Sequence, residues 1–382
     1  MPFGRFRGSL RPAVAALLVV GAVLTAGPGV ASADPAPPGL VRSRYETADP
    51  TRSINRDAGY SVEIPGSGHS LWLFGDTFWP DGFLLGSSAT VGPFTPGRVP
   101  TQLTEVPTPP APVRAPHSGP PQRFLPVPEG LVGKDGGDCY GAPNSAPATW
   151  PTGAAVVPGT YNVLITYMDV CLTFPDTISV QRYGVAEYDP LNNRVLRQTT
   201  VFETSVLPFQ LTLGSPVFAD DGYLYLYGST CDDTAGASGF CMDGRVVVAR
   251  VPAHAQYWRD SGSYLFRAGT AWTTDWAQSQ PMVPGARPAG LVHVVDARSL
   301  GKGLVLVEQV DLAGGFRIWR SDFFTTGWTE LTTGSTDCGR NPSPIDMCRT
   351  FAAHVELSTT SELLLSYYDP GPSHLSMVAV PW

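Results

Sequence analysis

The sequence predicts an all-β fold, and three observations support this prediction. Charged residues are only 15% of the chain, while its 382 residues include 41 Gly and 38 Pro, a composition typical of many strands joined by turns. No long segment has apolar residues at helical spacing that is free of Gly, Pro or β-branched runs. Strand-like segments recur throughout, and turn signals such as Asp220-Asp-Gly222 separate several of them.

Taken in order, the predicted strands begin with a hairpin, in which residues 60–64 and 70–78 flank the turn Pro65-Gly-Ser-Gly-His69. Further strands are predicted from β-branched and aromatic runs between turn signals, at 161–167, 183–188, 194–202, 215–218, 223–228, 245–251, 264–266, 291–295, 303–310, 316–321, 352–357, 362–367 and 375–380. The Pro- and Thr-rich segment 92–119 is expected to be a surface excursion, because strands of the same character continue on both sides.

A short inner strand followed by an aromatic strand recurs five times, in YSVEI…LWLFGDTF, GAAVV…YNVLITYMD, SPVFADDGYLYLYGST, LVHVVD…GLVLVEQVD and AAHVELSTTSELLLSYYD. Recurrence at such a period indicates a propeller or an array. Five blades of roughly 40–50 residues each, with their loops, would use residues 34–382. We therefore predict a single domain with the fold of a five-bladed β-propeller, and a pair of β-sandwiches is the alternative.

The first 33 residues have the features of a secretory signal peptide. Arg5, Arg7 and Arg11 precede an apolar run at 13–24, and Ala31-Ser-Ala33 forms a small-residue cleavage site. The apolar run is short for a membrane span. We expect a secreted mature chain that begins near Asp34 and has no membrane attachment after cleavage.

The formal net charge of −8 and the lack of a basic cluster disfavour nucleic acid and anionic membranes as partners. A neutral or weakly charged ligand is easier to accommodate, and we expect the chain to be a monomer. No cofactor is expected, although a structural calcium in the channel stays open as an alternative.

All six Cys lie in the predicted mature region, where export permits disulfides. A zinc site is the rival interpretation, but the chain has no CxxC pair and no His at ligand spacing, so no metal site is predicted. Spacing cannot prove connectivity, and the pairing we expect is Cys231 with Cys241, Cys338 with Cys348, and Cys139 with Cys171.

Two carboxylates mark the first hairpin. Asp57 precedes its first strand and Asp76 ends its second, and paired carboxylates facing one cleft are what glycosidic bond cleavage requires. In a propeller the inner strands line a channel and ligands meet the loops at its mouth, so Asp57 is a candidate base or nucleophile. The alternatives are a turn role for Asp57 and a structural role for Asp76, whose strand-end position Asp169 and Asp369 share.

Two further carboxylates are catalytic candidates. Glu308 lies in an apolar strand, and apolar surroundings raise the pKa of a carboxyl, as a general acid requires. His354 and Glu356 lie two apart on the predicted strand 352–357, so they project to one face. Arg349, just before that strand, would pair with a carboxylate and lower its pKa. Plain solvent-facing positions are the alternative, and Asp138 is a loop candidate of similar weight.

Several residues are candidates for substrate binding rather than chemistry. Arg56 is the neighbour of Asp57, and His354 would line the same cavity as Glu356. Trp150 and Trp272 fall in predicted loops, where indole rings can stack on a sugar face. His293, within an apolar run, is interpreted as a core residue.

Several of these segments resemble secreted five-bladed glycoside hydrolases. SPVFADDGYLYLYGS resembles the blade opening of arabinanases and β-xylosidases, while LWLFGDTF, SYLFRAGTAWTTDW and AAHVELSTTSELLLSYYDPG resemble an actinobacterial group of secreted propellers associated with endo-D-arabinanase activity. The resemblance implies a secreted glycoside hydrolase that acts on a polysaccharide, with arabinan as the implied substrate. Ser215 stands where the arabinanase pattern has Asp, and the Glu-Gly/Ala-Pro acid motif is missing. Ser215 is therefore assigned to substrate binding, and a non-catalytic carbohydrate-binding propeller is the alternative.

Overall fold

The computed structural model describes residues 41–44, 54–100, 103–110, 120–132, 139–140, 142–173, 177–203, 212–231, 244–336, 348–369 and 374–382, with the backbone alone at 41–44, 177, 212–213, 231 and 374. All of them belong to the unit Ala36–Trp382. The expected signal peptide, residues 1–33, lies outside this part of the chain.

The prediction of an all-β fold is confirmed. The strands form six sheets, and the described helical segments are short: α1 (Ala255–Trp258), η1 (Glu129–Leu131), η2 (Ser261–Ser263), η3 (Trp276–Gln278) and η4 (Arg298–Leu300). No helix among these residues is both long and apolar enough to cross a bilayer.

The predicted hairpin opens the first large sheet. Sheet I has the order β3 (Tyr60–Ile64), β4 (His69–Phe74), β7 (Ser88–Pro93) and β8 (Thr104–Glu105). A small sheet beside it contains β2 (Asn55–Arg56), β5 (Thr77–Trp79) and β6 (Gly82–Leu84). The segment 92–119 therefore contributes the end of β7 and all of β8, which corrects its interpretation as a surface excursion.

The next two sheets follow in chain order. Sheet II is β9 (Ser145–Val156), β10 (Val163–Thr173), β11 (Thr177–Asp189) and β12 (Arg194–Glu203). Sheet III is β13 (Thr212–Phe218), β14 (Tyr223–Cys231), β15 (Gly244–Pro252), β16 (Leu265–Ala268) and β17 (Ala271–Thr273). Trp150 lies in β9 and Trp272 in β17, so the prediction that both lie in loops is wrong.

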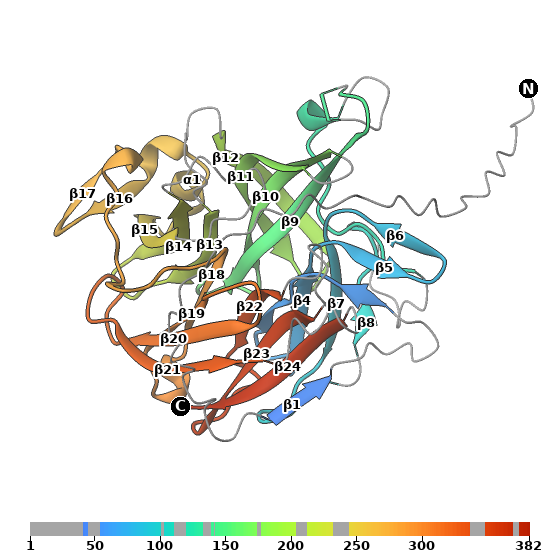
Figure 1. Cartoon of the computed structure of the whole chain (residues 1–382). Coiled ribbons are helices and arrows are strands. Elements are labelled where there is room, and N and C mark those ends of the chain that lie inside the picture. Colours follow the sequence, from blue (N-terminus) through green and yellow to red (C-terminus); the bar gives the residue numbers. More distant parts are fainter. Residues whose placement is uncertain are drawn as a thin grey trace, which may run out of the picture. The chain divides into compact units, whose positions relative to one another are not determined.

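Two more sheets complete the series. Sheet IV is β18 (Val292–Asp296), β19 (Leu304–Gln309), β20 (Gly315–Ser321) and β21 (Thr329–Ser335). Sheet V is β22 (Arg349–His354), β23 (Glu362–Asp369), β24 (His374–Pro381) and β1 (Val41–Arg44). The strand β1 thus pairs antiparallel with β24, from the other end of the chain (Figure 1).

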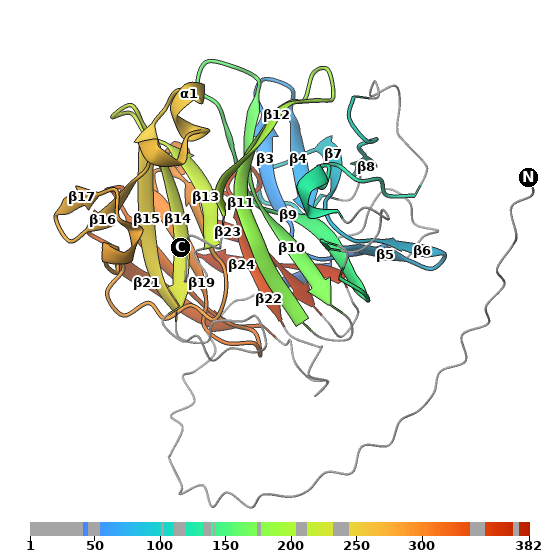
Figure 2. The ribbon, with the colours of Figure 1, turned by 90° about the horizontal axis from the view of Figure 1, so that it is seen from above.

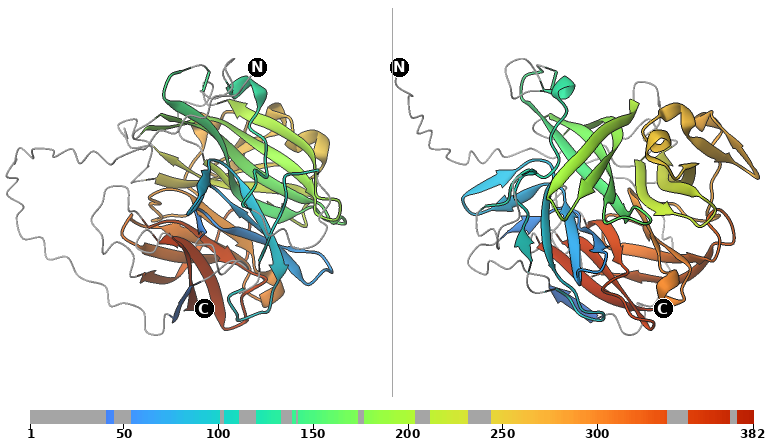
Figure 3. Two further views of the ribbon diagram at one scale, coloured as in Figure 1. Left: turned by 90° about the vertical axis from the view of Figure 1, so that its right-hand side faces the viewer. Right: turned by 180° about the vertical axis from the view of Figure 1, so that it is seen from behind.

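The first strands of sheets I to V contact one another in a closed series: β3 with β9, β9 with β13, β13 with β18, β18 with β22, and β22 with β3. Figures 1 and 2 show the sheets following one another around a common centre, from blue through green, yellow and orange to red. The two views of Figure 3 show the red strands of sheet V returning to the blue strands of sheet I.

An apolar core fills each space between successive sheets, because side chains on one face of each strand alternate toward the neighbouring sheet. Leu73 and Ile165 belong to the core between sheets I and II, and the other three successive pairs have cores of the same kind. A fifth core, with Trp72, Leu364 and Met377, joins sheet V back to sheet I. Packing therefore closes the series, unlike the two facing sheets of a sandwich.

Candidate functional site

Asp57 and Asp76 lie opposite each other, just after β2 and just before β5. The pairing of β2 with β5 sets Arg56 opposite Thr77, and beyond it the Asp57 N–H donates to the Asp76 carbonyl at 2.9 Å while the Gly75 N–H donates to the Asp57 carbonyl at 2.7 Å. This pattern places two residues, Gly75 and Asp76, opposite one, as in a β-bulge. The two carboxylate residues predicted from the first hairpin are thus neighbours, and the Asp57 charge raises the pKa of Asp76.

Arg349 joins this pair from the far end of the chain. Its Nη2 lies 3.0 Å from Asp57 Oδ2, and its Nε donates to Asp57 Oδ1 at 3.3 Å. The guanidinium also lies 4.7 Å from the centre of the Tyr368 ring. Such a two-point contact fixes the direction of a carboxylate as well as its charge. The predicted pairing of Arg349 with a carboxylate is confirmed.

Asp76 is held in a different way. Its Oδ1 accepts hydrogen bonds from the Gly86 N–H at 2.8 Å and from Trp150 Nε1 at 2.7 Å. Burial raises the pKa of Asp76 to about 6, although these two hydrogen bonds lower it, because loss of hydration outweighs them; the nearby Asp57 charge raises it further. The Asp57 carboxylate is thus paired with a cation, whereas the neighbouring Asp76 carboxyl is buried and is held by two uncharged N–H donors.

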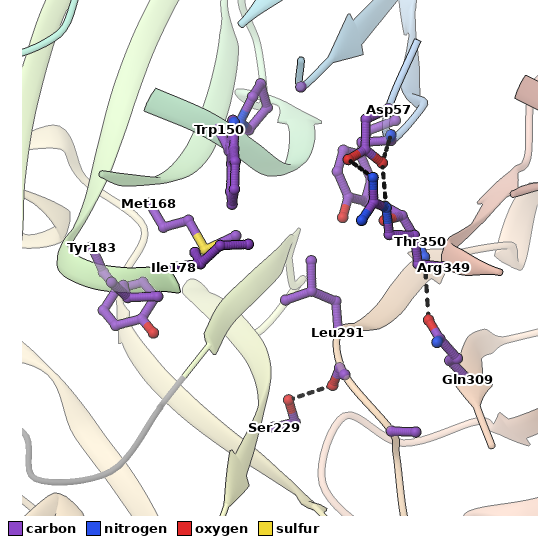
Figure 4. Close-up of a pocket in the computed structure, with 17 residues that line it drawn as sticks. Asp57, Trp150, Met168, Ile178, Tyr183, Ser229, Leu291, Gln309, Arg349 and Thr350 are labelled. Carbon is purple, nitrogen blue, oxygen red and sulfur yellow. Dashed lines mark hydrogen bonds and ion pairs between the residues drawn. The ribbon is translucent and has the colours of Figure 1, made fainter. Parts of the chain in front are cut away.

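A pocket of about 140 Å³ opens beside Asp57, and we call it the Asp57 pocket. It lies where the inner strands begin: Asp57 precedes β3, Leu291 precedes β18 and Arg349 starts β22. Figure 4 shows the polar side chains Asp57, Arg349, Thr350 and Gln309 on one side. Figure 4 shows Trp150, Met168, Ile178 and Tyr183 on the opposite side, which is mostly apolar.

The backbone of the Asp57 pocket is strained at two places. Ala58 has φ +61° and Thr350 has φ +59°, a region that costs a residue with a Cβ about 1–2 kcal/mol and is uncommon above all for a β-branched one. Each directly follows one partner of the Asp57–Arg349 pair, and both line the pocket. Strained residues of this kind cluster at functional sites.

Of the two residues predicted to share the strand-end position of Asp76, Asp369 ends β23, whereas Asp169 lies within β10. Asp169 on β10 is buried and accepts a hydrogen bond from the Thr149 hydroxyl at 2.6 Å, and burial raises its pKa to about 6. Asp369 on β23 accepts one from the Ser376 hydroxyl at 3.2 Å. Like Asp76, neither lines the Asp57 pocket, so what distinguishes Asp76 from them is its neighbour Asp57.

Glu308 is not brought to the Asp57 pocket. It is buried on β19, where Oε1 accepts from the Arg287 N–H and Oε2 from Trp319 Nε1, both at 2.6 Å. Burial raises its pKa, in the predicted direction. Both carboxylate oxygens are used to hold the segment before β18 and the strand β20, which is a structural arrangement.

Arg56 is also directed away from the pocket. It is buried, donates to Ser88 Oγ at 2.8 Å, forms an ion pair with Glu105 and lies over the Phe74 ring. It therefore joins β2 to the outer strands of sheet I, although its neighbour Asp57 lines the pocket.

Replacing Arg56 by Met is expected to lower the free energy of unfolding by about 3–5 kcal/mol, because Glu105 stays buried without its cation. Urea denaturation measures this. The control Arg182→Met removes a pair with the half-exposed Glu203 and is expected to cost about 1 kcal/mol or less. Equal losses in the two variants would contradict the structural role of Arg56.

Two substrate-binding candidates lie elsewhere in sheet III. The buried Ser215 on β13 accepts a hydrogen bond at Oγ from the Val294 N–H at 2.8 Å, so it joins two inner strands. Trp272 packs at the outer edge of sheet III, with the Arg250 guanidinium 4.1 Å from its ring. Neither lines the Asp57 pocket.

Glu356 belongs to a second pocket, of about 530 Å³, where the inner strands end. It lines this Glu356 pocket together with Glu63 of β3 and Asp296 of β18, whereas His354 is buried and does not line it. Because β22 ends at His354, the two residues do not share a strand face as predicted. Both nevertheless contact Ser61. They are therefore not part of the site that contains Asp57.

The disulfide between Cys139 and Cys171 is confirmed. The other two predicted pairs involve Cys241 and Cys338, which lie outside the described residues, as does Asp138. In the part of the chain that the structure describes, no group of three or more His, Cys, Asp or Glu comes together as a metal site.

The sequence interpretation missed Gly86 and Gln309, two residues that support the Asp57 site. Gly86 donates to Asp76, while Gln309 accepts from the Thr350 N–H at 3.2 Å and donates to the Cys348 carbonyl at 3.0 Å, which fixes the segment that carries Arg349. For Gln309, the one sequence signal was its polar side chain at the end of the largely apolar run 304–309.

No protein-family model matches the chain, and no curated protein is similar to it in sequence. Solved structures with a similar backbone include a GH43_1 enzyme from Xanthomonas citri complexed with xylose, at 11% identity and TM-score 0.46 over 86% of this chain and 87% of that one. The family 117 glycoside hydrolase Zg3597 from Zobellia galactanivorans matches at 10% identity and TM-score 0.45 over 89% and 88%. An endo-arabinase from Bacteroides thetaiotaomicron matches at 10% identity and TM-score 0.44 over 86% and 95%. At these values no family is assigned to the chain.

Proposed function

We propose that the chain is a five-bladed β-propeller that binds a neutral carbohydrate in the Asp57 pocket and hydrolyses a glycosidic bond there. The closed series of five sheets supports the architecture, since each inner strand contacts the next and β1 completes the last sheet. The observation that carries the function is the pair of opposed carboxyls, Asp57 and Asp76, beside a pocket.

The backbone pairing of these two residues keeps them close enough for the Asp57 charge to raise the pKa of Asp76. Two carboxyls near one pocket are what hydrolysis of a glycosidic bond requires. Asp57, oriented by Arg349, is proposed as the nucleophile or base. Asp76 keeps its proton up to about pH 6 and is proposed as the acid that protonates the leaving oxygen while the glycosidic C–O bond breaks.

The pocket walls support a neutral sugar as the ligand. Asp57 and Arg349 neutralise each other on the polar side, so an anionic or cationic group would find no unpaired opposite charge in this pair. The Trp150 ring and the neighbouring apolar side chains offer a surface for the apolar face of a sugar ring. Arabinan is the first substrate to test. The signal-like residues 1–33 support secretion, so we propose that the chain acts outside the cell, as a monomer.

Incubation of the purified chain with arabinan, arabinogalactan and xylan tests the proposal. We expect new reducing ends from at least one of them, with oligosaccharides visible by mass spectrometry. If no polysaccharide in a broad panel is cleaved, the hydrolase proposal fails. Detection of the mature protein in the medium of the native host, cleaved near Asp34, tests secretion.

A second candidate function is carbohydrate binding without hydrolysis. It is favoured by one observation: among the described residues that line the Asp57 pocket, Asp57 is the only carboxylate. Affinity electrophoresis in gels containing each polysaccharide separates the two candidates, because binding without hydrolysis retards the protein and releases no oligosaccharide.

A further inference from the structure

We propose that Ser61, His354, Glu356 and Ser366 form a proton-dependent clasp between sheets I and V, complete only while Glu356 carries a proton. The clasp lies next to the Glu356 pocket, at the end of the inner strands remote from Asp57. It joins β3 to the β22–β23 hairpin, which comes from the opposite end of the chain.

The contacts form one continuous row. Ser61 Oγ is hydrogen-bonded to Glu356 Oε1 and lies 2.6 Å from His354 Nδ1. His354 Nε2 lies 2.7 Å from Ser366 Oγ, which donates to the Gly59 carbonyl at 3.2 Å. His354 is fully buried, and its ring stacks on Trp72 at 4.6 Å. The row therefore crosses the seam between the two sheets through an apolar core.

The number of protons in the row limits which groups can donate a hydrogen bond. A serine hydroxyl has one proton, and Ser366 uses its own on the Gly59 carbonyl, so it must accept from His354 Nε2–H. A neutral His354 then has only a lone pair at Nδ1, which must accept the proton of Ser61. Ser61 Oγ can then only accept from Glu356. With the Ser366–Gly59 hydrogen bond in place, the row is fully satisfied only if Glu356 Oε1 carries a proton. The other His354 tautomer lets Ser61 donate to an ionised Glu356, but Ser366 must then donate to His354 and the Gly59 carbonyl loses its partner in the row.

The surroundings of the row favour these protonation states. Burial, and the nearby His293 of β18, hold the pKa of His354 well below its usual range, which keeps its ring neutral. Burial and the Glu63 charge raise the pKa of Glu356 to about 7, although the hydrogen bond from Ser61 lowers it.

The charged groups around Glu356 add only negative charge at this pocket. Besides Glu63 on β3, the pocket is lined by Asp296 on β18, which is paired with Arg298. The lining segments of β9 and β13, residues 154–156 and 216–218, are uncharged. Among the described lining residues no Lys or Arg is available to stabilise the Glu356 carboxylate.

Loss of the proton breaks the row. An ionised Glu356 requires the Ser61 hydroxyl to donate to it. This either leaves two lone pairs facing each other between Ser61 Oγ and His354 Nδ1, or moves the His354 proton to Nδ1 and breaks the Ser366–Gly59 hydrogen bond. Since the folded pKa of about 7 lies above the ordinary value of 4.5, the stabilisation is complete below pH 4.5 and falls as the pH rises from 4.5 to 7. Above about pH 7 the clasp is open and no further change is expected from this group.

Thermal unfolding of the wild type and of Glu356→Gln between pH 4 and 8.5 tests the clasp. The Gln amide donates to Ser61 at every pH, so the fall in Tm from pH 4.5 to 7.5 should be about 5 °C smaller in this variant than in the wild type. The control Glu362→Gln removes an exposed carboxylate of the same sheet and should retain the full wild-type dependence. A dependence that is equal in the wild type and Glu356→Gln overturns the proposal.

Hydrogen exchange of the wild type keeps the proposal testable if Glu356→Gln does not fold. After correction for the intrinsic pH dependence of exchange, the amides of β3 and β22 should lose at least tenfold in protection between pH 6 and 8, while those of β14 and β15 should not. Constant protection of β3 and β22 across this range overturns the clasp. Hydrolytic activity does not enter either measurement, so the clasp and the proposed function can fail separately.

Discussion

Replacing Asp57 by Asn is expected to lower the rate of polysaccharide cleavage by about 10²–10⁴-fold, the range that a positioned base or nucleophile contributes. The amide cannot attack an anomeric carbon or take a proton from water. It also leaves Arg349 without its carboxylate partner, so some loss of stability is expected as well. Assays of product release, with circular dichroism to confirm folding, measure the two effects separately.

The matched control for Asp57→Asn is Glu308→Gln. Glu308 is also a carboxyl with a raised pKa, but both its oxygens are bound by Arg287 and Trp319 away from the pocket. We expect this control to lose stability and to keep activity within about threefold. If Glu308→Gln abolishes cleavage while Asp57→Asn retains it, the catalytic assignment is wrong.

The second large expected effect is on the pH dependence of cleavage. If Asp76 supplies the proton, activity should fall as the pH rises above about 6, where Asp76 loses it. The Trp150 indole N–H stabilises the charged form of Asp76 and so lowers its pKa. Trp150→Phe should therefore move the alkaline limb upward by about one pH unit, since a hydrogen bond to a charged group contributes about 1.5–3 kcal/mol.

Trp272→Phe is the control for the pH shift. It makes the same chemical change on β17, outside the Asp57 pocket, and should leave the profile unchanged. Carbon NMR titration of the Asp76 carboxyl measures the same pKa without substrate. A lower or unchanged Asp76 pKa in Trp150→Phe would show that this hydrogen bond does not tune the acid.

Local patterns predicted the strands well, because alternation and turn chemistry act over a few residues. The first strand of the first hairpin, the aromatic strand β14 and the terminal strands β23 and β24 appear close to their expected positions. The predicted strand 70–78 is divided instead between β4 and β5, which belong to different sheets. Trp150 was misplaced because Pro147, Pro151 and Gly153 resemble a loop in the sequence. In the structure these residues lie in β9, with an irregular register at Thr166/Tyr167 of the neighbouring β10.

The candidate site was only partly predictable for a different reason. Asp57 and Arg349 are 292 residues apart, yet they meet because β3 and β22 are neighbouring inner strands. The same closure brings Ser61 to His354 and Glu356. A strand pattern shows which side chains share a face, but not which end of the strand forms which pocket.

By itself, the sequence determined the all-β class, the fivefold recurrence of hairpins and the presence of Asp57 and Asp76 at the first of them. These features depend on side-chain alternation, turn residues and neighbours in the chain. Only the tertiary structure decided that Asp57 and Asp76 lie opposite each other beside Arg349, that Glu308 and Arg56 hold sheets together, and that Glu356 belongs to a separate pocket. The physical reason is that packing sheet V against sheet I, through a core of buried apolar side chains, brings distant segments together.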